Sequence, residues 1–208
     1  MKRLLLAAFA ATLAFAQQDF SQVQIKTTKI SNNFYTLEGS GGMIGVLVGN
    51  DGVFMVDTQY AQLTNKIVAA IKAITPQPIK YVVNTHVHPD HVGGNEKLSK
   101  SGQTFTGGNV AGDLGGAGDQ AAIYAHENVL NRMSAKPAPG QPTLPFAAFP
   151  TDTYHIPFMN LSHFFNGEGV RLIHLPNAHT DGDTMVYFRG SDVIATGDVF
   201  TPSSYPVI

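Results

Sequence analysis

The chain has 208 residues, of which 43% are hydrophobic and only 13% are charged, and its formal net charge is −2. This length is enough for one sizeable folded domain, and the lack of a basic stretch argues against nucleic acid as a partner. The sequence contains no cysteine, which excludes disulfide bonds, thiol nucleophiles and thiolate metal ligands.

Residues 1–16 have the pattern of a secretory signal peptide. A basic start precedes an apolar stretch from Leu4 to Phe15, and a small-x-small cleavage pattern ends at Ala16. The stretch is short and rich in alanine for a membrane span, and no cysteine follows it as a lipid attachment site. We therefore expect a periplasmic or secreted protein without a membrane anchor, with a single domain over residues 17–208.

Short β-rich runs fill the sequence between residues 23 and 57. They predict strands at Val23–Thr27, Phe34–Glu38, Met43–Val48 and Val53–Asp57, separated by turn residues. The period then changes, because apolar residues recur at three- and four-residue steps from Leu63 to Ile74, which predicts a helix that covers the sheet. Prolines end this helix, and Ile79–Asn84 reads as another buried strand.

Three histidines and an aspartate follow that strand within six positions, in the run His86-Val-His88-Pro-Asp90-His91. Strand alternation places His86 and His88 on one face, and Asp90 and His91 follow in the turn. Imidazole and carboxylate groups are costly to bury without partners, and a bound metal supplies those partners. This run therefore predicts a metal site, with room for two ions.

The middle of the chain is less regular. A short helix is expected at Asn95–Ser99, six glycines fall between residues 107 and 118, and a helix is expected from near Asp119 to Met133. Residues 136–150 contain five prolines and connect two halves, either as an overhang that shapes the substrate pocket or as a plain linker. Further strands are expected at Leu161–Phe165, Val170–Leu175, Thr184–Phe188 and Val193–Thr196.

The His-x-His-x-Asp-His run resembles the motif of the metallo-β-lactamase superfamily of metal-dependent hydrolases. Two further matches follow in order: His179 in the segment 177–184, and Asp198 in the segment 194–200, each after an apolar strand. The resemblance covers nearly all of the chain after residue 20. It implies an α/β (α+β) fold of the four-layer αβ/βα sandwich type.

The resemblance also implies a ligand set. His86, His88 and His179 would hold a first metal ion, Asp90 and His91 a second, and Asp198 would bridge both. The family normally completes its second site with another histidine downstream, whereas no histidine follows His179 and the sequence ends ten residues after Asp198. We therefore expect a C-terminally truncated chain that lacks the last strand and helix, with a complete first site and a weakened second one.

These features predict an exported hydrolase with Zn²⁺ in two sites, acting on a small-molecule substrate; iron is the alternative metal. Bound zinc lowers the pKa of water from 15.7 toward about 7, and the resulting hydroxide attacks the carbonyl of an ester, thioester, lactone or lactam. Asp90 orients this nucleophile or relays its proton.

Four residues near the predicted ligands are candidates for fixing the orientation of the imidazoles by hydrogen bonds: Asp57, Thr85, Thr180 and Asp183. Asp57 reads equally well as a turn residue, and for Asp183 the turn interpretation is favoured. The remaining histidines at 126, 155, 163 and 174 lack ligand-like neighbours and are interpreted as structural. No pattern in the sequence specifies an oligomeric state.

Three other functions fit the same residues. The first is a β-lactamase proper, disfavoured by Asp198, because dedicated lactamases usually carry cysteine or serine there. The second is an iron-dependent dioxygenase of sulfur compounds, with one metal held by His86, His179 and Asp198. The third is a truncated metal-binding protein with little activity.

Overall fold

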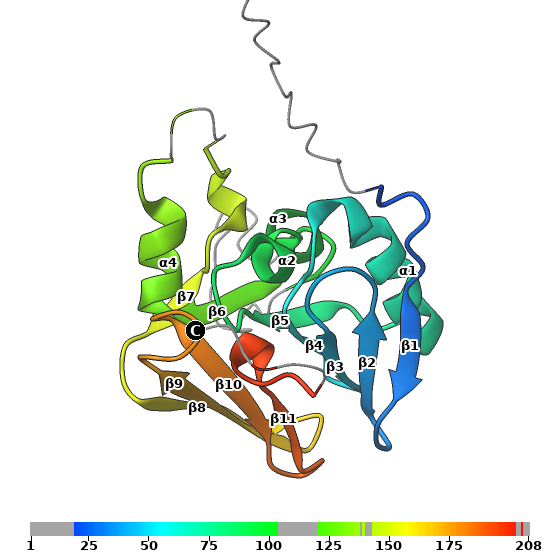
Figure 1. Cartoon of the computed structure of the whole chain (residues 1–208). Coiled ribbons are helices and arrows are strands. Elements are labelled where there is room, and N and C mark those ends of the chain that lie inside the picture. The colour runs from blue at the N-terminus through cyan, green and yellow to red at the C-terminus, as the bar shows by residue number, and fades with distance from the viewer. Residues whose placement is uncertain (1–18, 104–119, 138, 140–142, 203–204, 206–208) are drawn as a thin grey trace, which may run out of the picture.

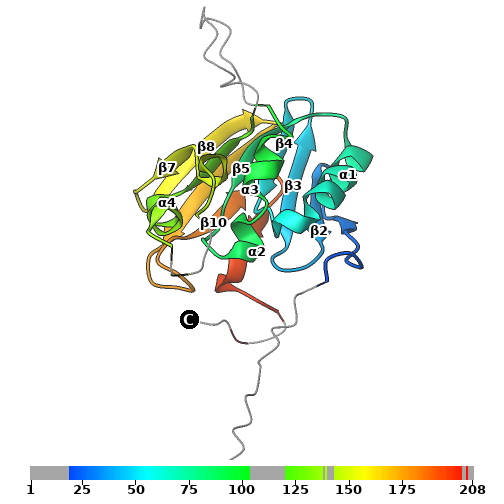
Figure 2. The same ribbon diagram turned by 90° about the horizontal axis from the view of Figure 1, so that it is seen from above.

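The computed structural model describes residues 19–103, 120–137, 139, 143–202 and 205. Two β-sheets face each other, with helices on the outer side of one of them (Figures 1 and 2). The first sheet has seven strands in sequence order: β1 (Lys26–Lys29), β2 (Phe34–Glu38), β3 (Ile44–Gly49), β4 (Gly52–Val56), β5 (Ile79–Val83), β6 (Ala122–His126) and β7 (Asp152–Tyr154). The second has the order β11 (Val193–Ala195), β10 (Asp183–Phe188), β9 (Glu168–Leu175), β8 (Phe158–Phe165).

The first sheet is mixed, and this mixture places the helices. Strands β1 to β4 pair antiparallel, whereas β4 to β7 pair parallel and therefore need crossover connections. The crossovers carry α1 (Thr64–Ile74), α2 (Pro89–Val92), α3 (Asn95–Ser99) and α4 (Glu127–Ser134), together with the 3₁₀ turns η1 (Ala61–Leu63) and η2 (Phe146–Ala148). A third 3₁₀ turn, η3 (Gly197–Val199), follows β11.

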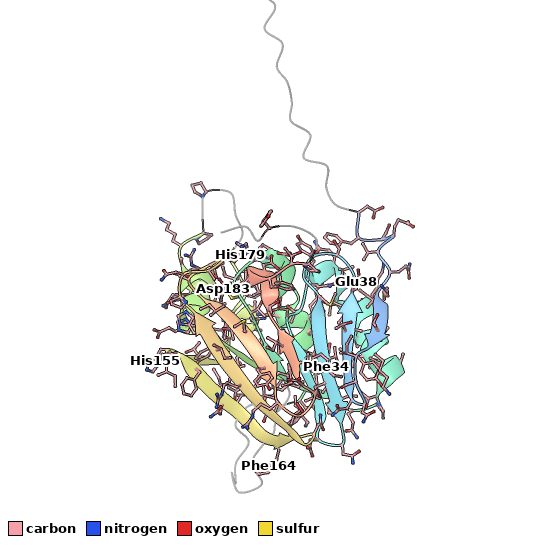
Figure 3. All side chains as sticks on the ribbon, turned by 60° about the horizontal axis from the view of Figure 1, so that its bottom comes forward. Phe34, Glu38, His155, Phe164, His179 and Asp183 are labelled. Carbon is pink, nitrogen blue, oxygen red and sulfur yellow. The ribbon has the colours of Figure 1, made fainter. Side chains whose placement is uncertain are left out.

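Two hydrophobic clusters hold the layers together. One joins α1 and α3 to the outer face of the first sheet, with Ile67 and Leu98 buried against Met55 and Val82. The other fills the space between the two sheets. There the Phe34 and Phe188 rings meet edge to face with centroids 4.8 Å apart, and Figure 3 shows Phe34 between the sheets. These aromatic contacts fix the two sheets against each other.

The structure confirms an α/β fold of the αβ/βα sandwich type. Most of the predicted strands and the first helix are present. In the described part of the chain, no helix covers the outer face of the four-stranded sheet. The leader at residues 1–16 and the glycine-rich segment 107–118 lie outside the described residues. Among the residues described, no helix has the length and hydrophobicity needed to cross a bilayer.

Two element predictions were wrong. The helix expected from Asp119 to Met133 is a strand followed by a helix, because Ala122–His126 forms β6 and pairs parallel with β5 and β7. A short apolar run does not distinguish a buried strand from a helix, and here pairing between neighbouring strands decides. The first strand was expected at Val23–Thr27 but begins at Lys26, since Val23 and Ile25 instead pack against the core beside the sheet.

Candidate metal centre

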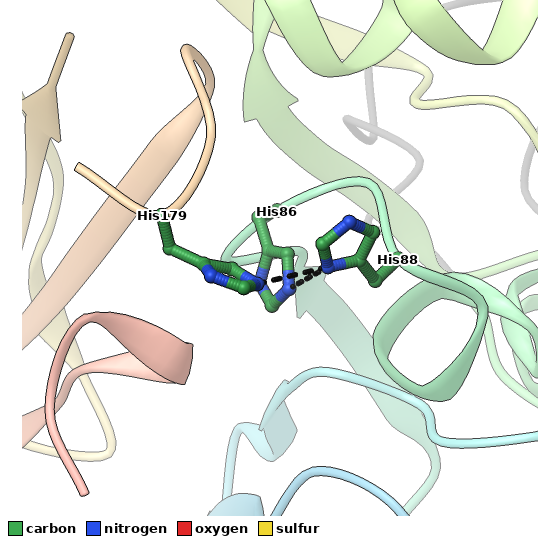
Figure 4. Close-up of side chains that lie close together, drawn as sticks. All are labelled: His86, His88 and His179. Carbon is green, nitrogen blue, oxygen red and sulfur yellow. Dashed lines mark hydrogen bonds between the residues drawn. The ribbon is translucent and has the colours of Figure 1, made fainter. Parts of the chain in front are cut away.

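Three histidine side chains converge at the carboxyl end of β5. His86 and His88 follow this strand, and His179 enters from the loop before β10, on the opposite side (Figure 4). The Nδ1 atom of His88 lies 3.0 Å from Nε2 of His86 and 2.9 Å from Nε2 of His179. One nitrogen of each ring thus points to a common centre, the geometry that three ligands of one metal ion require.

A second group adjoins the first. The Nε2 atom of His91 lies 3.6 Å from Asp90 Oδ2 and 3.2 Å from Asp198 Oδ1. The other carboxylate oxygen of Asp198, Oδ2, lies 3.7 Å from His179 Nε2 and 4.0 Å from His86 Nε2. Asp198 therefore directs one oxygen at each group, as a carboxylate shared between two ions would.

Asp57 and Thr85 set which nitrogen of His86 and His91 faces the centre. Asp57 accepts hydrogen bonds of 2.7 Å from the backbone N–H and the hydroxyl of Thr85. It also accepts one of 2.7 Å from Nδ1 of His91. Since the Thr85 hydroxyl donates to Asp57, its oxygen accepts from Nδ1 of His86 at 3.1 Å. Both imidazoles thus carry a proton on Nδ1 and turn Nε2 toward the centre, where a metal ion would bind.

The pKa values of two buried histidines in the centre are shifted in opposite directions. Burial, together with the positive charge of His91, lowers the pKa of His86 to about 3. Burial also opposes a charge on His91, but Asp57 and Asp198 outweigh it and raise the pKa of His91 to about 10. In return, the contact with His91 lowers the pKa of Asp198 to about 2. The positive charge of protonated His91 therefore offsets part of the negative charge of Asp57 and Asp198.

The remaining two predicted residues shape the His179 loop. The backbone N–H of Thr180 donates to Asp183 Oδ2, and the Thr180 hydroxyl accepts from the backbone N–H of Gly182 at 3.2 Å. Asp183 is buried at the start of β10 (Figure 3), and burial raises the pKa of its carboxyl group. These contacts are those of turn residues, and they hold the loop that carries His179.

Two glycines permit the close approaches on which the centre depends. A Cβ atom at Gly42 would collide with the His91 imidazole. Gly197 has a φ of +53°, and a Cβ there would lie 2.6 Å from the Thr85 hydroxyl, which Asp57 already holds. Neither Gly42 nor Gly197 was assigned to the site from the sequence. The available signals were that Gly42 directly precedes a predicted strand and that Gly197 directly precedes the predicted ligand Asp198.

A cavity of about 420 Å³ opens beside the second group. His91 and Asp198 line it together with apolar side chains from β2 and β4, among them Phe34 and Val56. A substrate could therefore reach the metal-facing atoms through a partly apolar crevice of ordinary ligand-binding size.

The residues present fit a bound metal. His91 Nε2 is buried, and its 3.2 Å contact with Asp198 departs from hydrogen-bond geometry, so this atom has no hydrogen-bond partner among the described residues. The donor set consists only of imidazole nitrogens and carboxylate oxygens, which suits zinc and also iron. A buried nitrogen without a partner, aimed at carboxylates, is explained by a cation between them.

A separate pair of histidines lies away from this centre, as the structural interpretation expected. The rings of His126 and His174 stack 3.5 Å apart with an interplanar angle of 9°. His126 caps α4, because its Nδ1 accepts from the backbone N–H of Asn128 at 3.3 Å. The His174 ring contacts the carbonyl oxygen of Asp181 at 2.9 Å. The pair therefore joins α4 to β9 and to the His179 loop.

The sequence model of a known family matches residues 38–207, and this family is described as the metallo-beta-lactamase superfamily. A linear primary-alkylsulfatase of Pseudomonas sp. (strain ATCC 19151) is 30% identical over 84 residues, which are 40% of this chain and 14% of that protein. The chain thus spans about one seventh of the length of this curated relative.

Solved structures share the fold. A metallo-beta-lactamase with a HARLDQ motif from Cronobacter sakazakii superposes with a TM-score of 0.64 at 18% identity, covering 89% of this chain and 66% of that one. A mutant of the sec-alkyl sulfatase PisA1 superposes with a TM-score of 0.60 at 15% identity, covering 83% and 31%. Identities this low show the fold alone. The family match covers most of the chain, which therefore belongs to the metallo-beta-lactamase superfamily.

Proposed function

We propose that this protein is an exported, zinc-dependent hydrolase with two adjacent metal sites. His86, His88 and His179 would hold the first ion, Asp90 and His91 the second, and Asp198 would bridge them. The observation that carries the proposal is the placement of Asp198, whose Oδ1 faces His91 while its Oδ2 faces His86 and His179. When bound, zinc supplies a nucleophilic hydroxide near neutral pH and polarises the electrophile.

The chain's own residues do the rest. Asp57 and Thr85 turn Nε2 of His91 and of His86 toward the ions by holding the Nδ1 atom of each ring in a hydrogen bond. Asp90 lies 3.6 Å from Nε2 of His91 and its side chain is 27% exposed, so it is placed to orient the attacking water or to accept its proton. The crevice beside Asp198 receives the substrate.

The substrate bond that we propose is an ester, thioester, lactone or lactam. The alkylsulfatase relative favours a second candidate, the sulfate ester of an alkyl alcohol. The names of the structural neighbours keep a β-lactam as another. A mononuclear iron dioxygenase and a metal-binding protein of little activity remain alternative outcomes of the test.

The test combines metal analysis with a substrate panel. We expect zinc in the purified protein, and hydrolysis of p-nitrophenyl acetate, an alkyl sulfate or nitrocefin that a chelator abolishes and added zinc restores. His88→Ala should remove the metal and the activity, whereas His155→Ala, an exposed histidine elsewhere, should change neither. Folded protein that takes up neither zinc nor iron, or full activity in His88→Ala, would refute the proposal; iron with oxygen uptake would favour the dioxygenase.

Export is tested separately. Expression of the full chain in a Gram-negative host should place the protein in the periplasm, and N-terminal sequencing should start directly after Ala16. A cytoplasmic product that retains residues 1–16 would contradict export without affecting the proposed chemistry.

A further inference from the structure

A second cavity lies near the metal centre, and the function proposed above gives it no role. It has a volume of about 530 Å³ and lies between α2, the end of α4 and residues 143–149. Volumes of this size are typical of sites that enclose small organic ligands. Two of the elements that border it, α2 and α4, are labelled in Figure 1, and α2 also carries Asp90 and His91.

The floor of the cavity is apolar and well packed. Val92, Met133 and Ala148 line it, and each is only 6–7% exposed. Val92 and Met133 belong to a small hydrophobic cluster against which Val87 and Phe149 pack. Such a surface can make close contacts with a hydrocarbon group, whereas it has few hydrogen-bond partners for a polar group.

The rim also exposes apolar side chains. Leu144 lines the cavity and is 41% exposed, and Phe146 on the same segment is 90% exposed. Folded proteins commonly use such exposed apolar groups, where they adjoin a hollow, to bind ligands. The cavity is therefore open to solvent, and a ligand that covers these apolar side chains would bind with a favourable free energy.

The cavity borders the loop that carries His88, and one of its lining residues contacts the loop that carries His179. Val87 and Pro89, the residues on either side of His88, both line it. At another edge lies Arg132, whose Nε pairs with Asp181 Oδ1 at 2.6 Å, two residues after His179. An alkyl chain that reached this cavity from a reactive bond at the metal centre would therefore pass the backbone of residues 87–89.

We propose that the cavity between α2, α4 and residues 143–149 binds an apolar chain of the substrate. This inference rests on the proposed function and deepens it: the substrate is an amphiphilic ester that bears a medium-length alkyl group. Each methylene that leaves water for an apolar site strengthens binding by about twofold to fourfold. Substrates with longer alkyl chains should therefore have a higher kcat/KM, because the cavity binds the alkyl chain in the transition state as well as in the ground state.

The test uses the zinc-loaded enzyme and p-nitrophenyl esters from acetate to decanoate, kept below micelle-forming concentrations. We expect kcat/KM to rise by about twofold to fourfold per methylene until the cavity is full. Leu144→Asp places a charge on the cavity wall, and Ala135→Trp, at an exposed lining position, fills part of the space. Both should reduce the ratio of decanoate to acetate kcat/KM, whereas Ile156→Asp, an equally exposed apolar residue outside the cavity, should preserve it.

A binding measurement separates this inference from the function on which it rests. Calorimetric titration of the same proteins with decanoate and with acetate should show a preference for decanoate that Leu144→Asp and Ala135→Trp reduce. If no ester is hydrolysed but this preference is found, the proposed function fails and the cavity assignment stands. A flat chain-length profile with equal affinity for both acids, or a preference that survives in both cavity variants, would overturn the inference.

Discussion

The carboxylate of Asp57 receives a 2.7 Å hydrogen bond from Nδ1 of His91, and both side chains are almost completely buried. Asp57 is held for this contact at a φ of +64°, in a region that L-residues seldom adopt. This conformation turns the chain after β4 so that the Asp57 carboxylate reaches Nδ1 of His91. An unusual backbone conformation thus determines the direction of the histidine that faces Asp198.

Asp57→Asn should weaken the second metal site more than the first, because Asp57 contacts His91 directly and His86 only through Thr85. The amide lacks the charge that holds the His91 proton on Nδ1, and loss of such a partner typically costs 10–100-fold in metal affinity. We expect the more weakly bound zinc ion to be lost first on dialysis, as measured by elemental analysis. Asp192→Asn is the matched control, because Asp192 also has a positive φ, of +53°, but belongs to a distant turn. Equal metal loss in both variants would contradict the assignment of Asp57.

Zinc uptake should release a proton from His91. Because the pKa of His91 is raised to about 10, Nε2 of His91 is protonated at neutral pH in the metal-free protein. A zinc ion that binds Nε2 must displace this proton. His86 contributes no proton, because its pKa of about 3 already leaves it neutral.

Affinity for zinc should therefore rise by up to about tenfold per pH unit between roughly pH 7 and 9. Calorimetry in buffers of different ionisation enthalpy counts the released protons directly. Zinc binding without proton release in that range would show that His91 is neutral in the metal-free protein.

Gly197→Ala should disrupt the position of Asp198. The substitution strains a left-handed residue, by about 1–2 kcal/mol, and brings its Cβ to 2.6 Å from the Thr85 hydroxyl. Gly167→Ala carries the same strain without the collision, because Gly167 has a φ of +76° and nothing within 4 Å of the added atom. We expect both variants to lose stability in thermal unfolding, but only Gly197→Ala to lose zinc. Retention of zinc by both would show that the approach of η3 to Thr85 is dispensable.

Acid should destabilise the stacked pair of His126 and His174. Burial, together with His174, lowers the pKa of His126, so the unfolded chain binds a proton more readily than the folded one. The contribution of His126 to stability is therefore complete above the unfolded pKa of about 6.5 and declines as the pH falls below it, by at most about 1.4 kcal/mol per pH unit.

His126→Asn tests this assignment, because asparagine can still accept the hydrogen bond that caps α4 but does not titrate. The free energy of unfolding of this variant, from urea titrations at several pH values, should decline less steeply below about pH 6.5. His155→Asn, at an exposed position, should retain the wild-type slope. An unchanged slope in His126→Asn would assign the acid sensitivity to another group.

Much of the centre could be predicted because its residues are close in the sequence or follow apolar strands. His86, His88 and His91 lie in one run, and the strand before them places that run at the edge of the sheet. His179 and Asp198 were found through a family resemblance, and their approach to the run depends on the pairing of β9, β10 and β11, which single strands do not reveal.

The predictions failed where tertiary contacts overrule local pattern. Ala122–His126 has only buried and half-buried positions, without a polar exposed face that would mark a strand. Its strand conformation depends on hydrogen bonds to β5 and β7 on either side. Gly197 was missed for a related reason: its role arises from Thr85, more than a hundred residues earlier, so nothing near it in the sequence marks the contact.

The metal-facing residues are divided between the two sheets: the His86–His91 run follows a strand of the first, and His179 and Asp198 adjoin strands of the second. An ion bound by residues from both sheets would cross-link the two sheets. Its loss would therefore weaken the packing between the sheets as well as abolish catalysis. Proteases should then cut the chelated protein between the two sheets before either sheet unfolds, and scarcity of zinc would shorten the lifetime of the molecule in the cell.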